Sequence, residues 1–315
     1  MRNYVERVSI IGSGTMGHSI AISLAWANQP VKVYCMNSEE AVDASKNIGT
    51  KLEVMVTQKA ISVIEAEEIK KNIKLKTNLK ETLSGTTFII EAITENLDIK
   101  KEMFNTIADH IDEKVVVASN TSGFLPSELA SEFKHPEQFV ITHFWNPAHL
   151  IPLVEIVPSD KTSERTIERA KELMTKISKK PIVLKKEITG FIGNRLQYAM
   201  LREAQYLLDN GYADKEDIDA SVTYSIGRRY PVTGPLMTAD LGGLDVFSTI
   251  SDYLFKELSN ADHSGETITQ LVKEGNLGIK NRSGFYEWNE ELSGEINGQR
   301  EKLLLEFLKN DEREV

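Results

Sequence analysis

The sequence is poor in cysteine and has no long apolar run. Its 315 residues include one cysteine, Cys35, which cannot form a disulfide within the chain and is typical of a reducing compartment. No uncharged stretch of about 18 residues occurs, and no apolar signal core precedes the first strand-like segment. We therefore expect a cytoplasmic protein that does not bind a membrane.

The sequence also has fewer positive than negative charges. Lys and Arg number 37 against 47 Asp and Glu, which gives a formal net charge of −10. Binding to nucleic acid requires clustered Lys and Arg, so we predict no such partner. An acidic chain can still bind an anionic cofactor where a helix N-terminus supplies the positive field. Its partner is therefore expected to be a small molecule, and we predict no metal.

Short apolar runs alternate with helical segments over the first 187 residues. The predicted strands are Val8–Ile11, Val31–Tyr34, Thr87–Ile90, Val115–Ala118, Phe139–Thr142, Leu153–Val157 and Pro181–Leu184. The predicted helices are Met16–Asn28, Glu39–Gln58, Val63–Lys71, Leu97–Ile111 and Thr162–Ile177. Alternation of this kind favours an α/β fold, a Rossmann-type doubly wound and mostly parallel sheet.

The pattern changes after residue 187. A long apolar helix is predicted over Phe191–Leu208, ended by Asn210-Gly211, and no convincing strand follows. We therefore predict a nucleotide-binding domain over residues 1–187 and an all-helical domain over residues 188–315. These helices are too apolar for a lone small domain, so we expect a homodimer through the helical domain.

A glycine-rich loop stands between the first strand and the first helix, the context that a dinucleotide-binding motif requires. Glycines there permit a tight turn, the approach of the backbone to a pyrophosphate, and the packing of helix on strand. An ordinary strand-to-helix turn is the alternative. The residues predicted to bind the cofactor are Gly12, Gly14, Thr15, Met16 and Gly17.

The end of the second strand lacks the acidic residue that usually accepts a hydrogen bond from the cofactor ribose. It reads Tyr34-Cys35-Met36-Asn37. Asn37 either binds the ribose or caps the following helix, with Glu40 spaced as in a capping box. No Arg follows to bind a 2′-phosphate, so NAD is the preferred cofactor.

Ser122, His143 and Glu155 supply a hydroxyl, an imidazole and a carboxylate. A base held by a carboxylate beside a hydride acceptor is what oxidation of a secondary alcohol requires. Glu155 lies twelve residues after His143, and the intervening Asn146-Pro147 turn can fold the next strand back beside it. The alternatives are His149 as base, a solvent-facing Glu155, and a turn role for Ser122 and Asn120.

These residues belong to a longer series of motifs. The series comprises Glu91-Ala92-Ile93-Thr94-Glu95-Asn96, Ser119-Asn120-Thr121-Ser122, His143-Phe144-Trp145-Asn146-Pro147, Leu153-Val154-Glu155, Gly190-Phe191-Ile192-Gly193-Asn194-Arg195-Leu196, Gly234-Pro235, Asp240-Leu241-Gly242-Gly243-Leu244-Asp245 and Ser283-Gly284-Phe285-Tyr286. In order and spacing it resembles the 3-hydroxyacyl-CoA dehydrogenase family, from the N-terminus to about Trp288.

The resemblance implies NAD-dependent oxidation of a short-chain 3-hydroxyacyl-CoA, similar to 3-hydroxybutyryl-CoA, in fatty acid metabolism. It implies that His143 is the general base and that Glu155 orients it. Ser122 would hydrogen-bond the reacting oxygen, and Asn194 would donate to that oxygen or to the thioester carbonyl. The residues implied to flank the nicotinamide half of the cofactor are Glu95, Lys100 and Asn120.

The substrate stays open at this point. Relatives acting on acyl-CoA often carry basic residues in the helical hairpin after the second strand, which here holds Lys46, Lys51 and Lys59. The segment with Arg228 and Arg229 resembles that of relatives that oxidise small polar 3-hydroxy acids such as carnitine or gulonate. Arg there binds a free carboxylate or covers a helix end. The remaining alternative is a nucleotide-binding protein without catalysis.

Overall fold

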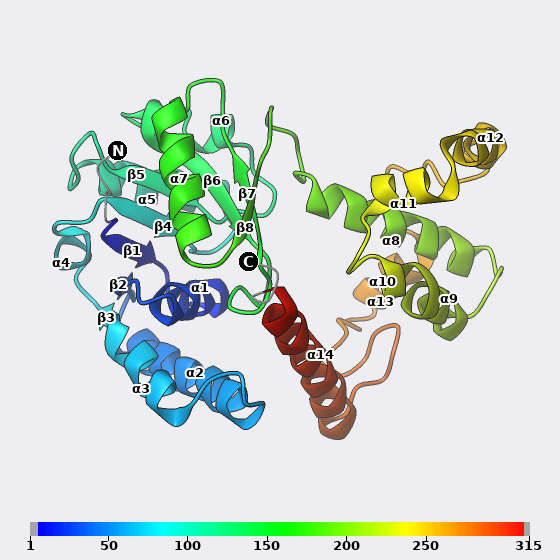
Figure 1. Ribbon diagram of the computed structural model, residues 1–315, viewed down its shortest axis with the longest axis horizontal. Helices are drawn as coiled ribbons and strands as arrows, with labels where there is room; N and C mark the ends of the chain where they lie inside the picture. The colour runs from blue at the N-terminus through cyan, green and yellow to red at the C-terminus, as the bar shows by residue number, and fades with distance from the viewer. Residues whose placement is uncertain (1–5, 312–315) are drawn as a thin grey trace. The chain divides into compact units, whose positions relative to one another are not determined.

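The computed structural model describes residues 6–311, and the chain divides into two units (Figure 1). The first unit comprises Met1–Ile192 with Gly298–Val315, and the second comprises Gly193–Asn297. The expected helical domain over 188–315 therefore differs at its end, because the last part of helix α14 (Glu290–Asp311) belongs to the first unit. The reason is apolar burial, since Leu305 of α14 is only 3% exposed.

The first unit is built on an eight-stranded sheet of order β3-β2-β1-β4-β5-β6-β7-β8. The strands are β1 (Val8–Ile11), β2 (Val31–Tyr34), β3 (Ile73–Lys76), β4 (Phe88–Glu91), β5 (Val116–Ser119), β6 (Phe139–Phe144), β7 (Leu153–Val157) and β8 (Lys180–Val183). All neighbours are parallel except β6 and β7. The predicted doubly wound, mostly parallel sheet is confirmed, while the edge strand β3 was missed because its Ile-Lys-Leu-Lys sequence lies within a charged stretch.

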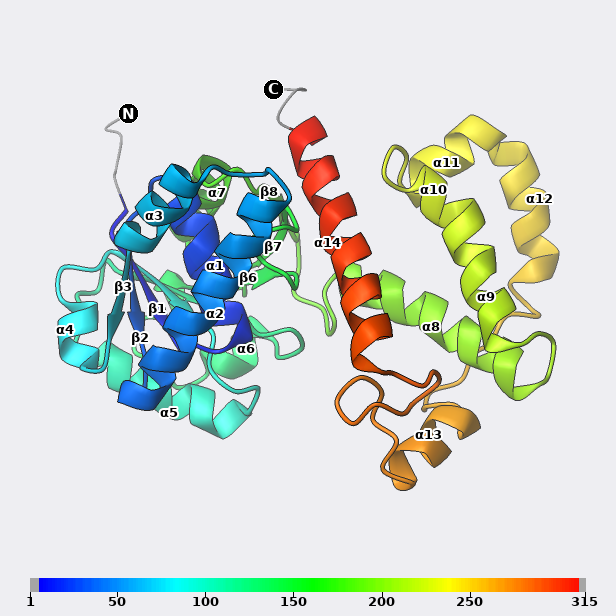
Figure 2. The ribbon, with the colours of Figure 1, turned by 90° about the horizontal axis from the view of Figure 1, so that it is seen from below.

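Helices cover both faces of this sheet (Figure 2). Alternate strand residues face opposite layers, so Ile10 packs in one apolar core and Ile11 in the other. The first core includes side chains of α1 (Thr15–Trp26), α2 (Ser38–Thr57), α3 (Val63–Asn72) and α7 (Glu164–Lys176). The second includes side chains of α4 (Leu79–Leu83), α5 (Leu97–Ala108) and α6 (Pro126–Leu129). A short helix, η1 (Pro136–Gln138), precedes β6.

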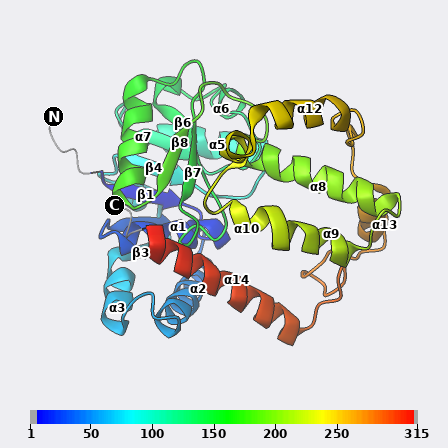
Figure 3. The ribbon, with the colours of Figure 1, turned by 45° about the vertical axis from the view of Figure 1, so that its right-hand side comes forward.

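The second unit is helical (Figure 3). Its helices are α8 (Gly193–Asp209), α9 (Lys215–Ser221), η2 (Val222–Ile226), α10 (Gly227–Arg229), α11 (Pro235–Gly242), α12 (Leu244–Leu254) and α13 (Glu266–Lys273). Within residues 193–297, extended pairing is limited to isolated bridges at Ser283. The predicted end of the first helix is confirmed, since Gly211 takes a positive φ of 67° just beyond α8. Among the described helices, none has the length and apolar character needed to span a membrane.

The strand order places a topological switch point at the carboxyl ends of β1 and β4. β1 lies between β2 and β4, so the chain leaves β1 toward one side and enters β4 on the other. At such a switch point the loops after the two strands diverge, and open α/β sheets bind ligands there. The glycine-rich loop follows β1, and the segment from Ala92 to Asn96 follows β4.

Candidate active site

The glycine-rich loop is shaped by two close backbone contacts. Gly12 has a φ of +106°, and a Cβ there would lie 2.6 Å from the carbonyl oxygen of Ala92. A Cβ on Gly17 would lie 2.0 Å from the carbonyl oxygen of Gly12. These two glycines are thus required by the fold itself, as the tight turn and the helix-on-strand packing of the motif demand.

Gly14 differs, because a Cβ on it would meet nothing within 4 Å. Its φ of −64° and ψ of −168° are open to any residue, and it is the N-cap of α1. The open space beside Gly14 leaves room for a cofactor phosphate at the helix N-terminus, and the predicted contacts of that phosphate with the N–H groups of Thr15 and Met16 stay predictions.

A cavity of about 440 Å³ joins this loop to the predicted catalytic residues. Its lining residues are Gly14, Thr15, Met16, Ala92, Ile93, Thr94, Glu95, Asn120, Ser122, His143, Phe144, Trp145 and Asn146. The ends of β1, β4, β5 and β6 thus bring a phosphate-binding loop, a hydroxyl and an imidazole to one cavity. That is the arrangement that hydride transfer from an alcohol to a dinucleotide needs.

His143 and Glu155 face each other across the antiparallel β6–β7 pair. His143 Nδ1 lies 2.8 Å from Glu155 Oε2, and the two residues are 5% and 0% exposed. The expectation that the Asn146-Pro147 turn folds the next strand back beside His143 is confirmed. The carboxylate accepts from Nδ1–H, which assigns that tautomer and leaves Nε2 as the nitrogen able to take a proton.

Two donors besides His143 help to hold the Glu155 carboxylate. Besides His143, Trp145 Nε1 donates to Oε2 at 3.3 Å and the backbone N–H of Ile192 donates to Oε1 at 2.9 Å. A buried carboxylate is costly without such partners, so both oxygens are compensated here. The solvent-facing alternative for Glu155 is wrong, because the side chain is fully buried.

Aromatic rings fix the plane of the imidazole. The Trp145 and Phe191 ring centroids lie 5.5 and 5.3 Å from that of His143. Neither role was predicted from the sequence, where Trp145 lies in the His143 motif and Phe191 in an apolar helix. Phe191 precedes α8 instead and takes a positive φ of 52° with 0% exposure.

Glu95 links the cavity to a buried charge network. Its Oε1 accepts from the Ser122 N–H at 2.9 Å, from Ser122 Oγ at 3.3 Å and from Thr121 Oγ1 at 2.6 Å. Burial would raise the pKa of Glu95, but these hydrogen bonds and the nearby Lys100 ammonium lower it overall. Glu95 is therefore an ionised acceptor that holds Ser122 in the cavity wall.

Lys100 lies beneath Glu95 and not in the cavity wall. Its ammonium is 2.6 Å from Glu91 Oε1 and 3.3 Å from Glu95 Oε2, and its side chain is 1% exposed. Ser119 Oγ donates to the other oxygen of Glu91 at 2.6 Å. These contacts position Glu95, and the place beside the nicotinamide implied for Lys100 by the family resemblance stays a prediction.

Asn120 and Asn37 both use their side-chain oxygens within the protein. Asn120 Oδ1 accepts from the Phe144 N–H at 2.9 Å, which ties the end of β5 to β6 while Asn120 lines the cavity. Asn37 Oδ1 accepts from the Glu40 N–H at 2.9 Å and caps α2. The capping alternative for Asn37 is therefore confirmed.

His149, the rival base, lies elsewhere. Its Nδ1 is 2.7 Å from Ser19 Oγ, and it does not line the cavity that holds His143. Burial, with Lys51 and Lys179 nearby, lowers the pKa of His149 to about 3. A base this weak is a poor proton acceptor near neutral pH.

The second unit holds the remaining predicted site residues. Asn194 lies in the first turn of α8, and Arg228 and Arg229 lie in α10. The Arg228 guanidinium lies 5.1 Å from the centroid of the Tyr224 ring, a cation–π contact within this unit. The contacts predicted for these three residues with substrate stay predictions.

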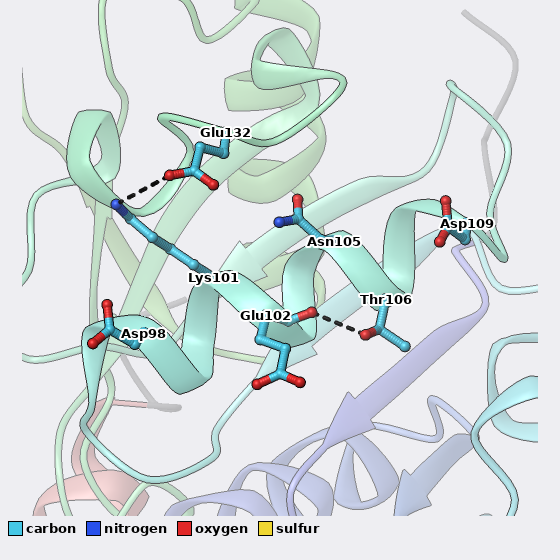
Figure 4. A pocket seen from close by; sticks show the side chains of 7 residues that line it. All are labelled: Asp98, Lys101, Glu102, Asn105, Thr106, Asp109 and Glu132. Atoms are coloured by element: carbon cyan, nitrogen blue, oxygen red, sulfur yellow. Dashed lines mark hydrogen bonds and ion pairs between the residues drawn. The ribbon is translucent and has the colours of Figure 1, made fainter.

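A second hollow, of about 450 Å³, lies along α5 (Figure 4). Its lining residues are Asp98, Lys101, Glu102, Asn105, Thr106, Asp109 and Glu132. Most of the charged groups are carboxylates, and the Lys101 ammonium is 4.0 Å from Glu132. Such a surface repels an anionic cofactor, so the hollow beside His143 is the candidate site.

The glycine geometry predicts opposite effects for two similar substitutions. Gly17→Ala should lower the free energy of unfolding by about 1–3 kcal/mol, because its Cβ meets a backbone oxygen. Gly14→Ala should leave unfolding unchanged but weaken NADH binding about tenfold or more, or about 1.4 kcal/mol. Thermal unfolding and NADH fluorescence titration measure the two effects. Normal NADH affinity in a folded Gly14→Ala variant would contradict this assignment.

Comparison with known proteins agrees with the site. Residues 7–188 match the NAD binding domain of 3-hydroxyacyl-CoA dehydrogenase, and residues 190–288 match its C-terminal domain. The 5-formyl-3-hydroxy-2-methylpyridine 4-carboxylate 5-dehydrogenase of Mesorhizobium japonicum is 31% identical and covers 96% of each chain. The 3-hydroxybutyryl-CoA dehydrogenase of Clostridioides difficile is 33% identical, over 90% of this chain and 99% of its own.

A solved structure is also closely similar. The crystal structure of a 5-formyl-3-hydroxy-2-methylpyridine 4-carboxylic acid 5-dehydrogenase, described as NAD+ dependent, matches with a TM-score of 0.90 and 29% identity. It covers 98% of this chain and 99% of its own. Both domains of the family model match, and relatives above 30% identity span most of the chain. The chain therefore belongs to the 3-hydroxyacyl-CoA dehydrogenase family and is an NAD-dependent oxidoreductase.

Proposed function

We propose that this enzyme oxidises the secondary alcohol of a small 3-hydroxy acid to the ketone, with His143 as general base. The observation that supports it most is the position of the His143–Glu155 pair. The imidazole lines the same cavity as Gly14, Thr15 and Met16, so a base and a dinucleotide site share one space. Proton removal and hydride transfer can then occur at one substrate carbon and its oxygen.

In this mechanism His143 Nε2 accepts the hydroxyl proton as the O–H bond breaks. Gly14, Thr15 and Met16 would hold NAD, which would supply the hydride acceptor for the same carbon. The imidazolium that forms is stabilised by the Glu155 carboxylate, 2.8 Å from Nδ1. In the reverse direction the imidazolium returns the proton to the ketone oxygen.

Ser122 is proposed to hydrogen-bond the reacting oxygen. Its hydroxyl lies in the cavity wall and is 3.3 Å from Glu95 Oε1. If this O–H turned from Glu95 to that oxygen, it would stabilise the charge that develops during proton transfer. Asn194 is proposed to add a second donor.

The preference for a free acid over an acyl-CoA comes from helix α14. Lys51, one of the three hairpin lysines, lines a cavity of about 190 Å³ together with Glu301 and Leu305 of α14. Burial lowers the pKa of Lys51, although Glu301 opposes the shift. A lysine covered in this way is poorly placed to bind the nucleotide end of coenzyme A.

Similarity to relatives also extends into helix α14. It begins at residue 290, beyond the residues that match the family's C-terminal domain. The pyridine carboxylate dehydrogenase structure covers 98% of this chain, so its similarity extends into α14. That relative is named for a carboxylate substrate. Arg228 and Arg229 are the cations we propose to bind such a carboxylate.

A short-chain 3-hydroxyacyl-CoA, preferred from the sequence, becomes the second candidate. It is favoured by the family and by the 3-hydroxybutyryl-CoA dehydrogenase relative. Lys46 and Lys59 of the hairpin remain exposed and available to an anionic nucleotide. The two candidates share the chemistry at His143 and differ in what holds the far end of the substrate.

The substrate proposal is tested by NADH consumption with dehydrocarnitine and with acetoacetyl-CoA. We expect kcat/KM to be about tenfold or more higher for the free acid, a difference of about 1.4 kcal/mol. The opposite ranking would establish the acyl-CoA candidate. No turnover of either compound by folded, NADH-binding protein would contradict the proposed function.

A homodimer through the second unit also remains a proposal. Leu236 and Leu241 of α11 and Leu244 of α12 are 85%, 75% and 62% exposed. Exposed apolar side chains gathered on neighbouring helices are typical of an interface. Light scattering should give twice the 35.4 kDa chain mass, and Leu236→Glu with Leu241→Glu should halve it. A monomeric wild-type protein would overturn the proposal.

A further inference from the structure

The predicted cofactor site lacks the carboxylate that usually binds the ribose. In the fold's usual arrangement a carboxylate at the end of the second strand accepts from the ribose hydroxyls. Cys35 holds this position and is 0% exposed, and its backbone N–H donates to the Lys76 carbonyl. The residue at the strand end thus points into the protein and cannot contact a ribose.

A carboxylate nevertheless reaches this place from the first turn of α2. Glu40 Oε2 accepts from the Met36 N–H at 2.9 Å and from Ser13 Oγ at 3.2 Å. Met36 immediately follows Cys35, and Ser13 lies between two glycines of the phosphate loop. Glu40 therefore bridges the end of β2 and the loop after β1, the two segments between which a cofactor ribose lies.

The local backbone holds Glu40 in this position. Asn37 caps α2 through the Glu40 N–H, which fixes the first turn of the helix. The Gly12 N–H donates to the Tyr34 carbonyl at 3.1 Å, which ties the phosphate loop to the end of β2. Both segments that Glu40 contacts are thus anchored independently of its side chain.

The contacts leave one oxygen available. Both of these hydrogen bonds go to Oε2, and within residues 6–311 no hydrogen bond is made to Oε1. Glu40 is half-buried, whereas its neighbour Glu39 is exposed. An anchored carboxylate with one free oxygen is the acceptor that a vicinal diol requires.

We infer that Glu40 replaces the missing strand-end carboxylate, accepts from the adenosine ribose hydroxyls of NAD, and excludes NADP. A 2′-phosphate at this position would meet a negative charge with no Arg near it in sequence to compensate. Glu40 is thus a residue that determines cofactor specificity. The inference rests on NAD as the cofactor and is independent of the substrate proposal.

The test compares Glu40→Gln with Glu39→Gln, which removes the same charge one residue away. Gln keeps an oxygen for Met36 and the same size, while the charged acceptor is lost. NADH and NADPH binding are followed by fluorescence titration without substrate, with thermal unfolding as the check on folding. We expect Glu40→Gln to raise the Kd for NADH about tenfold or more and to leave NADPH binding equal or tighter.

Three outcomes would overturn the inference. An unchanged NADH affinity in Glu40→Gln would show that its carboxylate does not bind the ribose. Equal weakening of NADH and NADPH would show that Glu40 only shapes the phosphate loop. An equally large change in NADH affinity in Glu39→Gln would show that the loss of one surface charge, and not a contact of Glu40 with the ribose, causes the effect. Since no substrate is present, none of these outcomes depends on which acid or ester the enzyme oxidises.

Discussion

The active site depends on the reversal of strand direction between β6 and β7. Only an antiparallel neighbour places Glu155 directly opposite His143 after a short connection, because parallel neighbours need a long crossover. That register places His143 Nδ1 2.8 Å from Glu155 Oε2, with both side chains buried. Trp145 and Ile192 also donate to this carboxylate, so the imidazole keeps one tautomer and one orientation.

A second buried network supports the opposite wall of the cavity. The Lys100 ammonium forms ion pairs with the buried Glu91 and with Glu95 in the cavity wall, and Glu95 in turn holds Ser122. Lys100 and Glu91 therefore act from beneath the site by holding Glu95, which in turn fixes Ser122 in the cavity wall. Buried ion pairs and hydrogen bonds of this kind keep a reacting hydroxyl and an imidazole in one geometry.

The sequence predicted elements and chemistry well where the signal was local. A few consecutive residues are enough to identify an apolar strand, the glycine-rich loop or the His143 motif. It predicted less where contacts are distant in the chain. The return of α14 to the first unit depends on Leu305, and the Leu303-Leu304-Leu305 run does not show which of its residues is buried there. Glu40 reads as a helix-cap residue, and only the fold shows that its carboxylate contacts Ser13.

The central claim, that Glu155 acts through His143, is tested most directly by a double-mutant cycle on kcat/KM. His143→Gln should reduce the rate by a factor of about 10²–10⁴, as expected for loss of a general base. If Glu155 acts only by orienting and stabilising the imidazole, adding Glu155→Gln to that variant should cause almost no further loss. Additive losses in the double variant, or a near-normal rate for His143→Gln, would contradict the account.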